Sequence, residues 1–534
     1  MANRTKWWVT IGLMVGVLVA ALDATIVDTA FPRMITDLHG ESIFTWVITT
    51  YMLASTAIVP VVGKLADIYG RKVFYLTGIV LFVVGSMLCG AAQDMVQLIL
   101  FRGLQGIGGG MLMPIAFTII GDIFPGAERA KMQGVFGAVW GLASVIGPKL
   151  GGWITTEHGW RWIFYVNLPV GIAAFVIMFI VYKESKGTRR PVDWLGSFTV
   201  TAGIVAFLLA LARGGEAWTW TSWQSLGLFG AAVVLLGSFL YIETKVPEPV
   251  LDLSNFRNRT YTVMNLAGFV MGAGMFGAIV YIPWFIQGVI GVDPNVAGNV
   301  MTPMMMTMVV FSILAGRLAL AVPYRYQITA GLGIVGSGYY LMAHWSVTTT
   351  QLHATLSSMV VGAGLGLMLP IMALAVQNAF PASKRGAVTS ANTFFRQVGA
   401  TVGVTAFGVI FNNQMAHQFQ QTLAPMLAKA GGALAAMPPQ AAAFLQQATE
   451  DPQALVRILL SPEAQASIPE PIRAQFIGGV KEMMANSVHA VYWTGLGVAL
   501  LGILLTQFLG NVSLKRQAAE QGGEVHLETP VMAE

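Results

Sequence analysis

Charged residues are scarce in this chain of 534 residues. Only 10% of its residues are Asp, Glu, Lys or Arg, and 55% are hydrophobic. Soluble domains carry about 25% charged residues, so this composition excludes an ordinary soluble domain. It predicts an integral membrane protein.

Cysteine and nucleotide-binding motifs are also lacking. Cys89 is the single cysteine, which excludes an internal disulfide. The phosphate-binding pattern G-x-x-x-x-G-K-S/T does not occur, so no ATP site is visible. The glycine-rich "GLQGIGGG" (103–110) lies inside an apolar stretch, where close helix packing explains it. We predict no cofactor, no metal, no nucleic-acid partner and no enzymatic activity.

Long apolar stretches, by contrast, fill the chain. A helix that spans a hydrocarbon core of about 30 Å needs roughly 20 apolar residues. The first stretch is too long for a signal peptide and contains Asp23 and Asp28. We predict fourteen transmembrane helices, at residues 7–30, 43–63, 73–93, 96–120, 131–154, 161–182, 194–212, 224–243, 261–288, 297–321, 326–345, 353–379, 386–412 and 487–511.

Polar linkers divide these stretches into six, two and six. They are "YKESKGTRRPVDWLG" (182–196) and "ETKVPEPVLDLSNFRNRT" (243–260). The pattern predicts two homologous six-helix bundles with an inserted helix pair. The predicted divisions are a first bundle at 1–182, linkers and inserted helices at 183–260, a second bundle at 261–512 with an extracellular insertion at 413–486, and a cytoplasmic tail at 513–534.

The extracellular insertion contains "PQALVRILL" and "IRAQFIGGVKEMMANSV", whose apolar spacing predicts short amphipathic helices. It is either an insertion without a role in transport or a docking site for a partner or the membrane surface.

The basic residues give the orientation. Most of the 30 Lys and Arg lie on one side when both termini are placed in the cytoplasm, as the positive-inside rule requires. This predicts a multi-pass protein of the cytoplasmic (inner) membrane. The asymmetry also accounts for the net charge of +5.

A few ionisable side chains lie inside the predicted spans, where each costs at least about 2.5–3.5 kcal/mol and is a functional candidate. They are Asp23, Asp28, Arg102, Lys149 and Arg396.

Asp23 and Arg102 are candidate partners on different helices. Asp23 lies in "LDATIVDTAFP" (22–32), past the middle of the first span, and such an acid can exchange protons. A hydrogen bond between helices is the structural alternative. Arg102 has Gln105 on nearly the same face, and a buried arginine needs acceptors.

A membrane-edge turn, "GKLADIYGRK" (63–72), carries Asp67 and Arg71. Because they are four residues apart, they can pair with each other or with a helix end of the other bundle. This predicts a conformational latch, and solvated surface charge is the alternative reading. The corresponding "GRLALAVPYRYQ" (316–327) has no acid.

Together, "LDATIVDTAFP", "GKLADIYGRK", "RGLQGIGGG" and "ASVIGPKLGGW" resemble the signature motifs of the major facilitator superfamily. With fourteen spans, "GWRWIFYVNLPVG" (159–171) and "NTFFRQVGATVG" (392–403), the chain resembles its drug:proton antiporter branch. The resemblance implies an all-helical fold of two bundles that rock about a central cavity, exchanging lipophilic, often cationic compounds for protons.

The resemblance also implies roles for the matching positions. Asp23 corresponds to the membrane acid and Arg102 to the fourth-span arginine, and with Asp28 they are the predicted proton-coupling residues. The predicted latch is Gly63, Asp67, Gly70 and Arg71, and the predicted antiporter motif is Gly147, Pro148, Lys149, Gly151 and Gly152.

Two positions depart from the family pattern. Asp28 stands where the branch usually has asparagine, and Lys149 where it has an apolar residue. Both lie at similar depth in the outer third of the bilayer, so we hypothesise that they form an ion pair near the outer gate. The alternatives are that Lys149 reaches outer water alone or that it is an introduced substitution that jams the motif.

Aromatic and flexible side chains can contact drugs inside a cavity. The candidates for the substrate cavity are Trp46, Tyr51, Gln105, Met113, Trp140, Phe269, Met271, Phe276, Tyr281, Trp284, Gln287, Phe394 and Arg396.

We therefore predict a monomeric, proton-coupled multidrug exporter whose partners are small lipophilic substrates, protons and the lipid bilayer. One alternative is an exporter of a dedicated metabolite or lipid, with an anionic group on Lys149. A second is a substrate-sensing or lipid-moving protein with little proton coupling.

Overall fold

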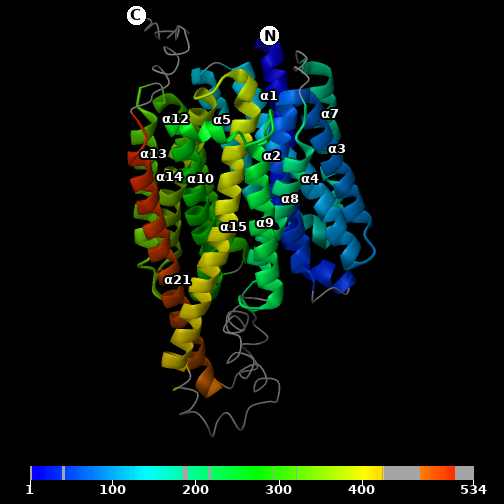
Figure 1. Ribbon diagram of the computed structural model, residues 1–534. Coiled ribbons are helices and arrows are strands. Elements are labelled where there is room, and N and C mark those ends of the chain that lie inside the picture. The colour runs from blue at the N-terminus through cyan, green and yellow to red at the C-terminus, as the bar shows by residue number, and fades with distance from the viewer. Residues whose placement is uncertain are drawn as a thin grey trace, which may run out of the picture.

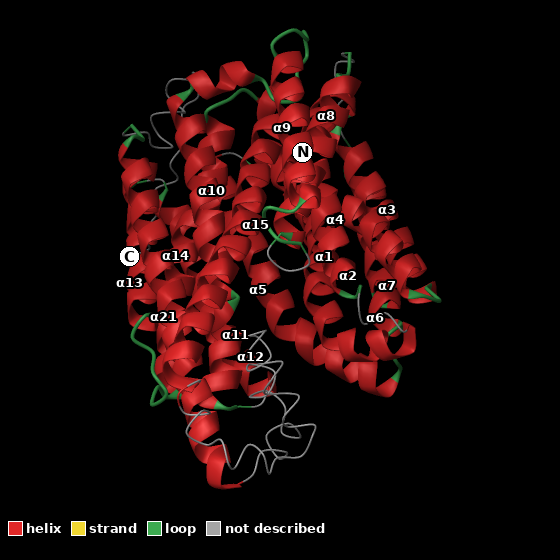
Figure 2. Cartoon of the chain, turned by 60° about the horizontal axis from the view of Figure 1, so that its bottom comes forward, coloured by secondary structure: helices red, strands yellow, loops and turns green. Residues whose placement is uncertain are grey.

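The computed structural model describes residues 3–38, 43–124, 126–183, 191–214, 218–292, 294–319, 321–423, 425 and 470–510, apart from some side chains inside these ranges. The described elements are all helical (Figures 1 and 2). They are α1 (Asn3–Leu38), α2 (Thr45–Tyr69), α3 (Arg71–Ala91), α4 (Met95–Ile123), α5 (Gly126–Glu157), α6 (Trp162–Tyr165), α7 (Asn167–Val181), α8 (Trp194–Arg213), α9 (Trp223–Glu243), η1 (Leu253–Arg257), α10 (Arg259–Ile279), α11 (Tyr281–Phe285), η2 (Ile286–Ile290), α12 (Pro294–Leu318), α13 (Tyr324–Met342), α14 (Gln351–Asn378), η3 (Ala382–Lys384), α15 (Arg385–Gln418), η4 (Phe419–Leu423) and α21 (Glu470–Gln507).

Eleven helices within the described ranges are long and apolar enough to cross a membrane. Each of the fourteen predicted stretches overlaps a described helix, while the count of fourteen spans stays a prediction. Large apolar side chains such as Phe179, Ile180, Val233 and Leu504 are exposed on the outer helix faces. This exposure is expected in a lipid bilayer, because apolar side chains are stable in contact with lipid tails and unfavourable in contact with water.

The helices form two groups that repeat the same packing. In the first group, α1 to α7, the pairs α1 with α5, α2 with α4, α3 with α4, α1 with α7 and α3 with α7 are in contact. The second group, α10 to α15 and α21, repeats them as α10 with α15, α12 with α14, α13 with α14, α10 with α21 and α13 with α21. Figure 2 shows α10, α13, α14 and α21 on one side and α2, α3, α4 and α7 on the other.

The groups meet along two seams. Helix α2 packs against α15, and α5 packs against α12. The main apolar cores stay within one group each, between residues 9 and 182 or between residues 261 and 509. Helices α8 and α9 pack on each other, and α8 also contacts α2 and α15. The two groups are therefore in contact mainly along these two seams.

The polar region after α15 differs from the prediction. The segment 472–488 belongs to the long helix α21, so the expectation of a separate short helix is wrong there. Phe476, Val480, Met483 and Met484 are buried in the core of the second group. Because they continue one apolar helix face, packing extends the helix beyond the predicted span. The segment "PQALVRILL" and the tail 513–534 lie outside the described residues.

Both ends of the helical bundle lie on one side. Figure 1 shows the start of α1 and the end of α21 at the same end of the molecule. This arrangement agrees with an even number of crossings, while the identity of that side stays a prediction.

Helix α4 lies close to both α2 and α3 because its inner faces carry glycine. A Cβ on Gly108 would come within 2.7 Å of Phe82 Cα, and one on Gly106 would come within 2.6 Å of the Tyr51 carbonyl oxygen. Both clashes involve backbone, which cannot swing aside.

We expect Gly108→Ala to force α3 away from α4 and to lower stability by about 1–3 kcal/mol, the usual cost of overpacking. Thermal denaturation of the purified protein would measure this. Gly230→Ala in α9 is the matched control, since nothing lies within 4 Å of a Cβ there. Equal denaturation midpoints for both variants would contradict the packing argument.

Candidate functional site

The interior of the first group contains a buried acidic side chain and a buried basic side chain. Arg102 Nη1 donates to Asp23 Oδ2 at 2.6 Å, and the two residues are 2% and 1% exposed. The Gln105 amide donates to Asp23 Oδ1 at 2.8 Å, and the Asn167 amide donates to the same oxygen at 3.0 Å. We call Asp23, Arg102, Gln105 and Asn167 the Asp23 cluster.

The guanidinium of Arg102 is held on several sides. Its Nη1 also donates to Gln105 Oε1 at 2.8 Å, its Nε donates to the Val47 carbonyl at 3.4 Å, and its Cζ lies 4.2 Å from the centre of the Tyr51 ring. A buried ion pair is tolerated only when its remaining polar atoms are satisfied. Here α1, α2, α4 and α7 all contribute, so the pair ties four helices together.

Sequence reasoning found Asp23, Arg102 and Gln105 but missed Asn167. Asn167 is 2% exposed and also donates to Ser86 Oγ at 3.0 Å, which donates in turn to the Phe164 carbonyl. The available signal was an uncharged polar residue at the start of an otherwise apolar helix. Uncharged residues are common in spans, so this signal was weak.

Asp67, near the C-terminal end of α2, connects the two groups. Its Oδ1 accepts from Gly386 N at 3.0 Å, and its Oδ2 accepts from Ala387 N at 2.8 Å. These are unpaired amides of the first turn of α15, and a carboxylate there is favoured by the helix dipole. Arg71 Nη2 donates to Asp67 Oδ1 at 3.0 Å and to the Ala382 carbonyl at 2.9 Å.

Asp122, at the end of α4, completes this junction. It forms ion pairs with Arg71 and with Arg385, the latter at 3.4 Å. Arg385 also donates to the Gly121 carbonyl at 3.2 Å. We call Asp67, Arg71, Asp122, Arg385 and the Gly386 and Ala387 amides the latch after their predicted role, which stays a prediction; in this structure these groups are in contact.

The two remaining predicted latch residues shape the turn. Gly63 lies against Ser390 and the Gly386 carbonyl of α15, so it lets α2 approach α15 closely. Gly70 joins α2 to α3 with φ of 106°, a conformation that other residues rarely adopt.

A repeated sequence forms a reciprocal pair of contacts beside the latch. "FPGAER" (124–129) and "FPASKR" (380–385) occupy equivalent places in the two groups. Arg385 of the second copy reaches Asp122 of the first group, and Arg129 of the first copy donates to Asn378 Oδ1 of the second group at 2.5 Å. Each copy of the repeat therefore places its arginine against a residue of the opposite group.

The linker after α9 lies across the same end. Lys64 pairs with Glu248 at 2.8 Å and Lys384 pairs with Asp252 at 2.9 Å. Burial raises the pKa of Asp252, but hydrogen bonds and charge from Lys384, with hydrogen bonds from Ser254, outweigh it and leave that pKa below its usual value. These contacts fasten the linker to α2 and to the start of α15.

The predicted antiporter motif lies on α5. Gly147 packs against Thr25 of α1, whose Oγ1 also donates to the Ala143 carbonyl at 3.2 Å. Gly151 is buried, Gly152 is half-buried, and Pro148 and Lys149 are exposed. The side chain of Asp28 lies outside the described residues, so its pairing with Lys149 stays a prediction.

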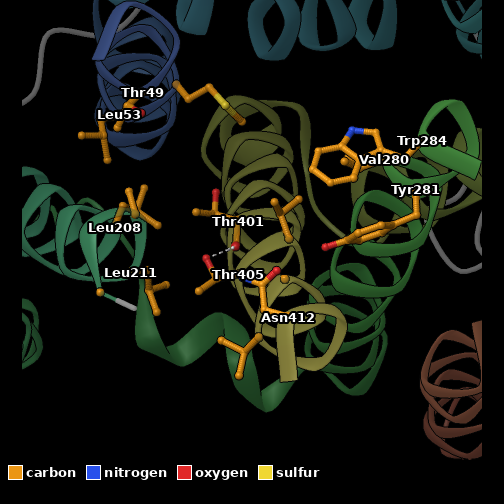
Figure 3. A pocket seen from close by; sticks show the side chains of 16 residues that line it. Thr49, Leu53, Leu208, Leu211, Val280, Tyr281, Trp284, Thr401, Thr405 and Asn412 are labelled. Carbon is orange, nitrogen blue, oxygen red and sulfur yellow. Dashed lines mark hydrogen bonds between the residues drawn. The ribbon is translucent and has the colours of Figure 1, made fainter. Parts of the chain in front are cut away.

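The predicted cavity residues do not share one surface. Tyr281 and Trp284 line a cavity of 410 Å³ between α2, α8, α11 and α15 (Figure 3). Tyr51 and Gln105 contact Arg102 in the Asp23 cluster instead, and Trp46 stacks with Arg213.

The other described candidates are not among the residues that line this cavity. Met271 is buried in the core of the second group. Met113, Phe269, Gln287, Phe394 and Arg396 are half-buried, and the side chains of Trp140 and Phe276 are outside the described set. Within the described ranges, no three His, Cys, Asp or Glu side chains lie close enough together to hold a metal ion.

Comparison with known proteins agrees with this architecture. The chain is 43% identical over 519 residues to the "Multidrug transporter protein MdtP" of Bacillus subtilis (strain 168), covering 96% of this chain and 94% of that protein. It is 36% identical over 512 residues to "Multidrug resistance protein 3" of the same organism, covering 96% of each.

Solved structures show the same fold. The human organic anion transporter MFSD10 (TETRAN) matches with a TM-score of 0.61 at 12% identity, over 94% of this chain and 99% of that one. The proton:xylose symporter XylE matches with a TM-score of 0.58 at 13% identity, over 97% and 100%. The sequence profile of the Major Facilitator Superfamily matches residues 13–404. The chain is thus a multi-pass membrane transporter and not an enzyme, and it belongs to the Major Facilitator Superfamily.

Proposed function

We propose that this transporter is a proton-coupled exporter of lipophilic, often cationic drugs, built from fourteen transmembrane helices in two bundles that alternate access. The observation that carries the proposal is the Asp23 cluster, a carboxylate 1% exposed and paired with Arg102 at 2.6 Å inside the first group. The relatives named as a multidrug transporter and a multidrug resistance protein support drugs as the substrate class.

Protonation of Asp23 gives the coupling step. A neutral carboxyl group no longer balances Arg102, and an unpaired buried cation typically costs several kcal/mol. The guanidinium then moves toward other acceptors or toward water, and the hydrogen bonds that Gln105 and Asn167 donate to Asp23 weaken because its oxygen no longer carries a negative charge. Because these side chains come from α1, α4 and α7, proton binding and helix rearrangement are linked.

Helix α4 connects this step to the latch. It carries Arg102 near its start and Asp122 near its end, about 30 Å apart at 1.5 Å per residue. A shift of α4 that relaxes the Asp23 cluster also moves Asp122 relative to Arg71 and Arg385. In this proposal the closed latch belongs to one access state, and breaking it permits the other.

Replacing Asp23 tests the proton step. We expect Asp23→Asn to abolish ethidium efflux driven by a pH gradient in proteoliposomes, because an amide side chain cannot take up and release a proton as a carboxylate does. Glu157→Gln, an exposed acid at the end of α5, is the matched control and should keep its transport. Gradient-driven efflux at the wild-type rate in Asp23→Asn would remove this residue from the mechanism.

Replacing Asp67 tests the latch. An amide keeps some hydrogen bonding to the start of α15 but loses its charge, so we expect Asp67→Asn to slow turnover while changing substrate affinity less. A cysteine at Met52, 48% exposed on α2, should react with maleimide at a changed rate because the access states are repopulated. If Asp67→Asn and Arg71→Gln both leave that rate unchanged, these residues act only as surface charge.

The hypothesised pair of Asp28 and Lys149 is tested by a double-mutant cycle. If the charges compensate each other, Asp28→Asn and Lys149→Leu should each reduce thermal stability and efflux more than the two together, by several kcal/mol at most. Strictly additive effects would show that no pair exists. Lys149 would then be studied as a substrate-contacting residue.

A further inference from the structure

The inserted helix α8 forms one wall of the 410 Å³ cavity in Figure 3. Leu208, Leu211, Ala212 and Gly214 at the end of α8 face residues of α2, α11 and α15 across it. On α15 the cavity begins at Thr401, 14 residues beyond Ala387 of the latch and therefore about 21 Å away along the helix. The cavity thus lies toward the ends of α2 and α15 that the latch does not close.

Among the residues that the structure describes, the lining of this cavity carries no charge. Its 16 residues include no Asp, Glu, Lys, Arg or His. One wall is aromatic, because the ring centres of Tyr281 and Trp284 lie 5.9 Å apart and both rings contact Phe411 behind them, at 4.9 and 5.8 Å. A volume within the usual range of about 300–1,000 Å³ and a mainly apolar lining suit a drug-sized molecule.

A few polar groups face this apolar space. Tyr281 is 7% exposed, and its hydroxyl makes no hydrogen bond that the described part of the chain contains. Gly408 opposite leaves room, since a Cβ there would lie 3.8 Å from that hydroxyl. The hydroxyl is accessible from the cavity, because it is not among the buried atoms that lack a partner, so a ligand atom at this point can accept its hydrogen bond.

The threonines of α15 supply acceptors. Thr401 donates to the Gln397 carbonyl at 3.2 Å and Thr405 donates to the Thr401 carbonyl at 3.1 Å. Each hydroxyl proton is used within the helix, as the dashed line in Figure 3 shows for Thr405, and each oxygen keeps lone pairs that can accept a hydrogen bond.

The end of α8 is anchored next to this cavity. The Arg213 guanidinium lies 5.0 Å from the Trp46 ring centre of α2 and 5.7 Å from that of Trp218. Cation–π contacts of this kind hold α8 on α2. These contacts place the end of α8 beside the start of α2, where both line the cavity.

We propose that this cavity binds an uncharged aromatic small molecule, with its ring against Tyr281 and Trp284 and an acceptor atom on the Tyr281 hydroxyl. The inserted helix pair then contributes directly to substrate choice, by admitting neutral compounds beside the cationic ones. This inference rests on the proposed export function, because it treats the bound molecule as a substrate.

Protection of a cysteine tests binding without any gradient or transport. In a Cys89→Ala background, Thr405→Cys is labelled with N-ethylmaleimide in proteoliposomes, with the uncharged dye Nile red or the cation ethidium added. We expect Nile red to slow the labelling and ethidium to leave it unchanged. Met52→Cys on the opposite wall is a second reporter should Thr405→Cys fold poorly.

Variants then locate the site. Leu211→Trp and Gly408→Leu fill the cavity from its two sides and should abolish the protection, whereas Leu226→Trp, on a side chain of α9 that is 59% exposed, should keep it. Tyr281→Phe should raise the Nile red concentration for half-protection about three- to tenfold, the worth of one hydrogen bond.

Three results would overturn the proposal: no protection by Nile red at either reporter, protection that survives both filling variants, or equal protection by ethidium. Labelling that lipid blocks and detergent restores, with no effect of Nile red, would assign the cavity to an acyl chain instead. A failure of efflux alone would count against the export function and not against this binding site.

Discussion

The ion pair of Asp23 and Arg102 is the constraint on which the rest of the transporter depends. Neither charge is stable alone in an apolar core, and together they are stable only with Gln105, Asn167 and the ring of Tyr51 around them. Four helices must therefore hold their register to satisfy one carboxylate. A proton is the smallest change that can disturb this arrangement, because it removes a charge without altering the shape of the side chain.

The latch differs from the buried ion pair, because it joins side chains of one group to the backbone and side chains of the other. Asp67 binds backbone amides at the start of α15, and Arg71 and Asp122 link that start to the ends of α2 and α4. These side chains are 6–21% exposed, against 0–3% for the buried pair, and in the proposed transport cycle they are the contacts that break. In the proposed mechanism, the buried pair keeps the first group together while the contacts between the groups change.

Much of this arrangement is predictable from the sequence, and the reason is energetic. Charges inside apolar stretches are so costly that the sequence alone makes Asp23 and Arg102 candidate partners. The spacing of Asp67 and Arg71 likewise predicts a contact with a helix end. Asn167 was missed because burying an uncharged amide costs less than burying a charge, so the residue does not stand out in the sequence. The length of α21 was underestimated because its polar residues obscure the apolar face that contains the buried Phe476 and Val480. The cavity beside α8 depends on side chains from four helices, and no local pattern encodes that proximity.

The repeated F-P-x-x-x-R segments show how duplication and asymmetry combine. Both arginines cross the interface, but Arg385 meets the carboxylate of Asp122 while Arg129 meets the amide of Asn378. An arginine binds a carboxylate more strongly than it binds a neutral amide, so the two symmetric halves of the junction differ in strength. The stronger half lies on α4, the helix that also carries Arg102. In the proposed mechanism, a change at the Asp23 cluster therefore reaches the stronger half of the junction along α4 itself.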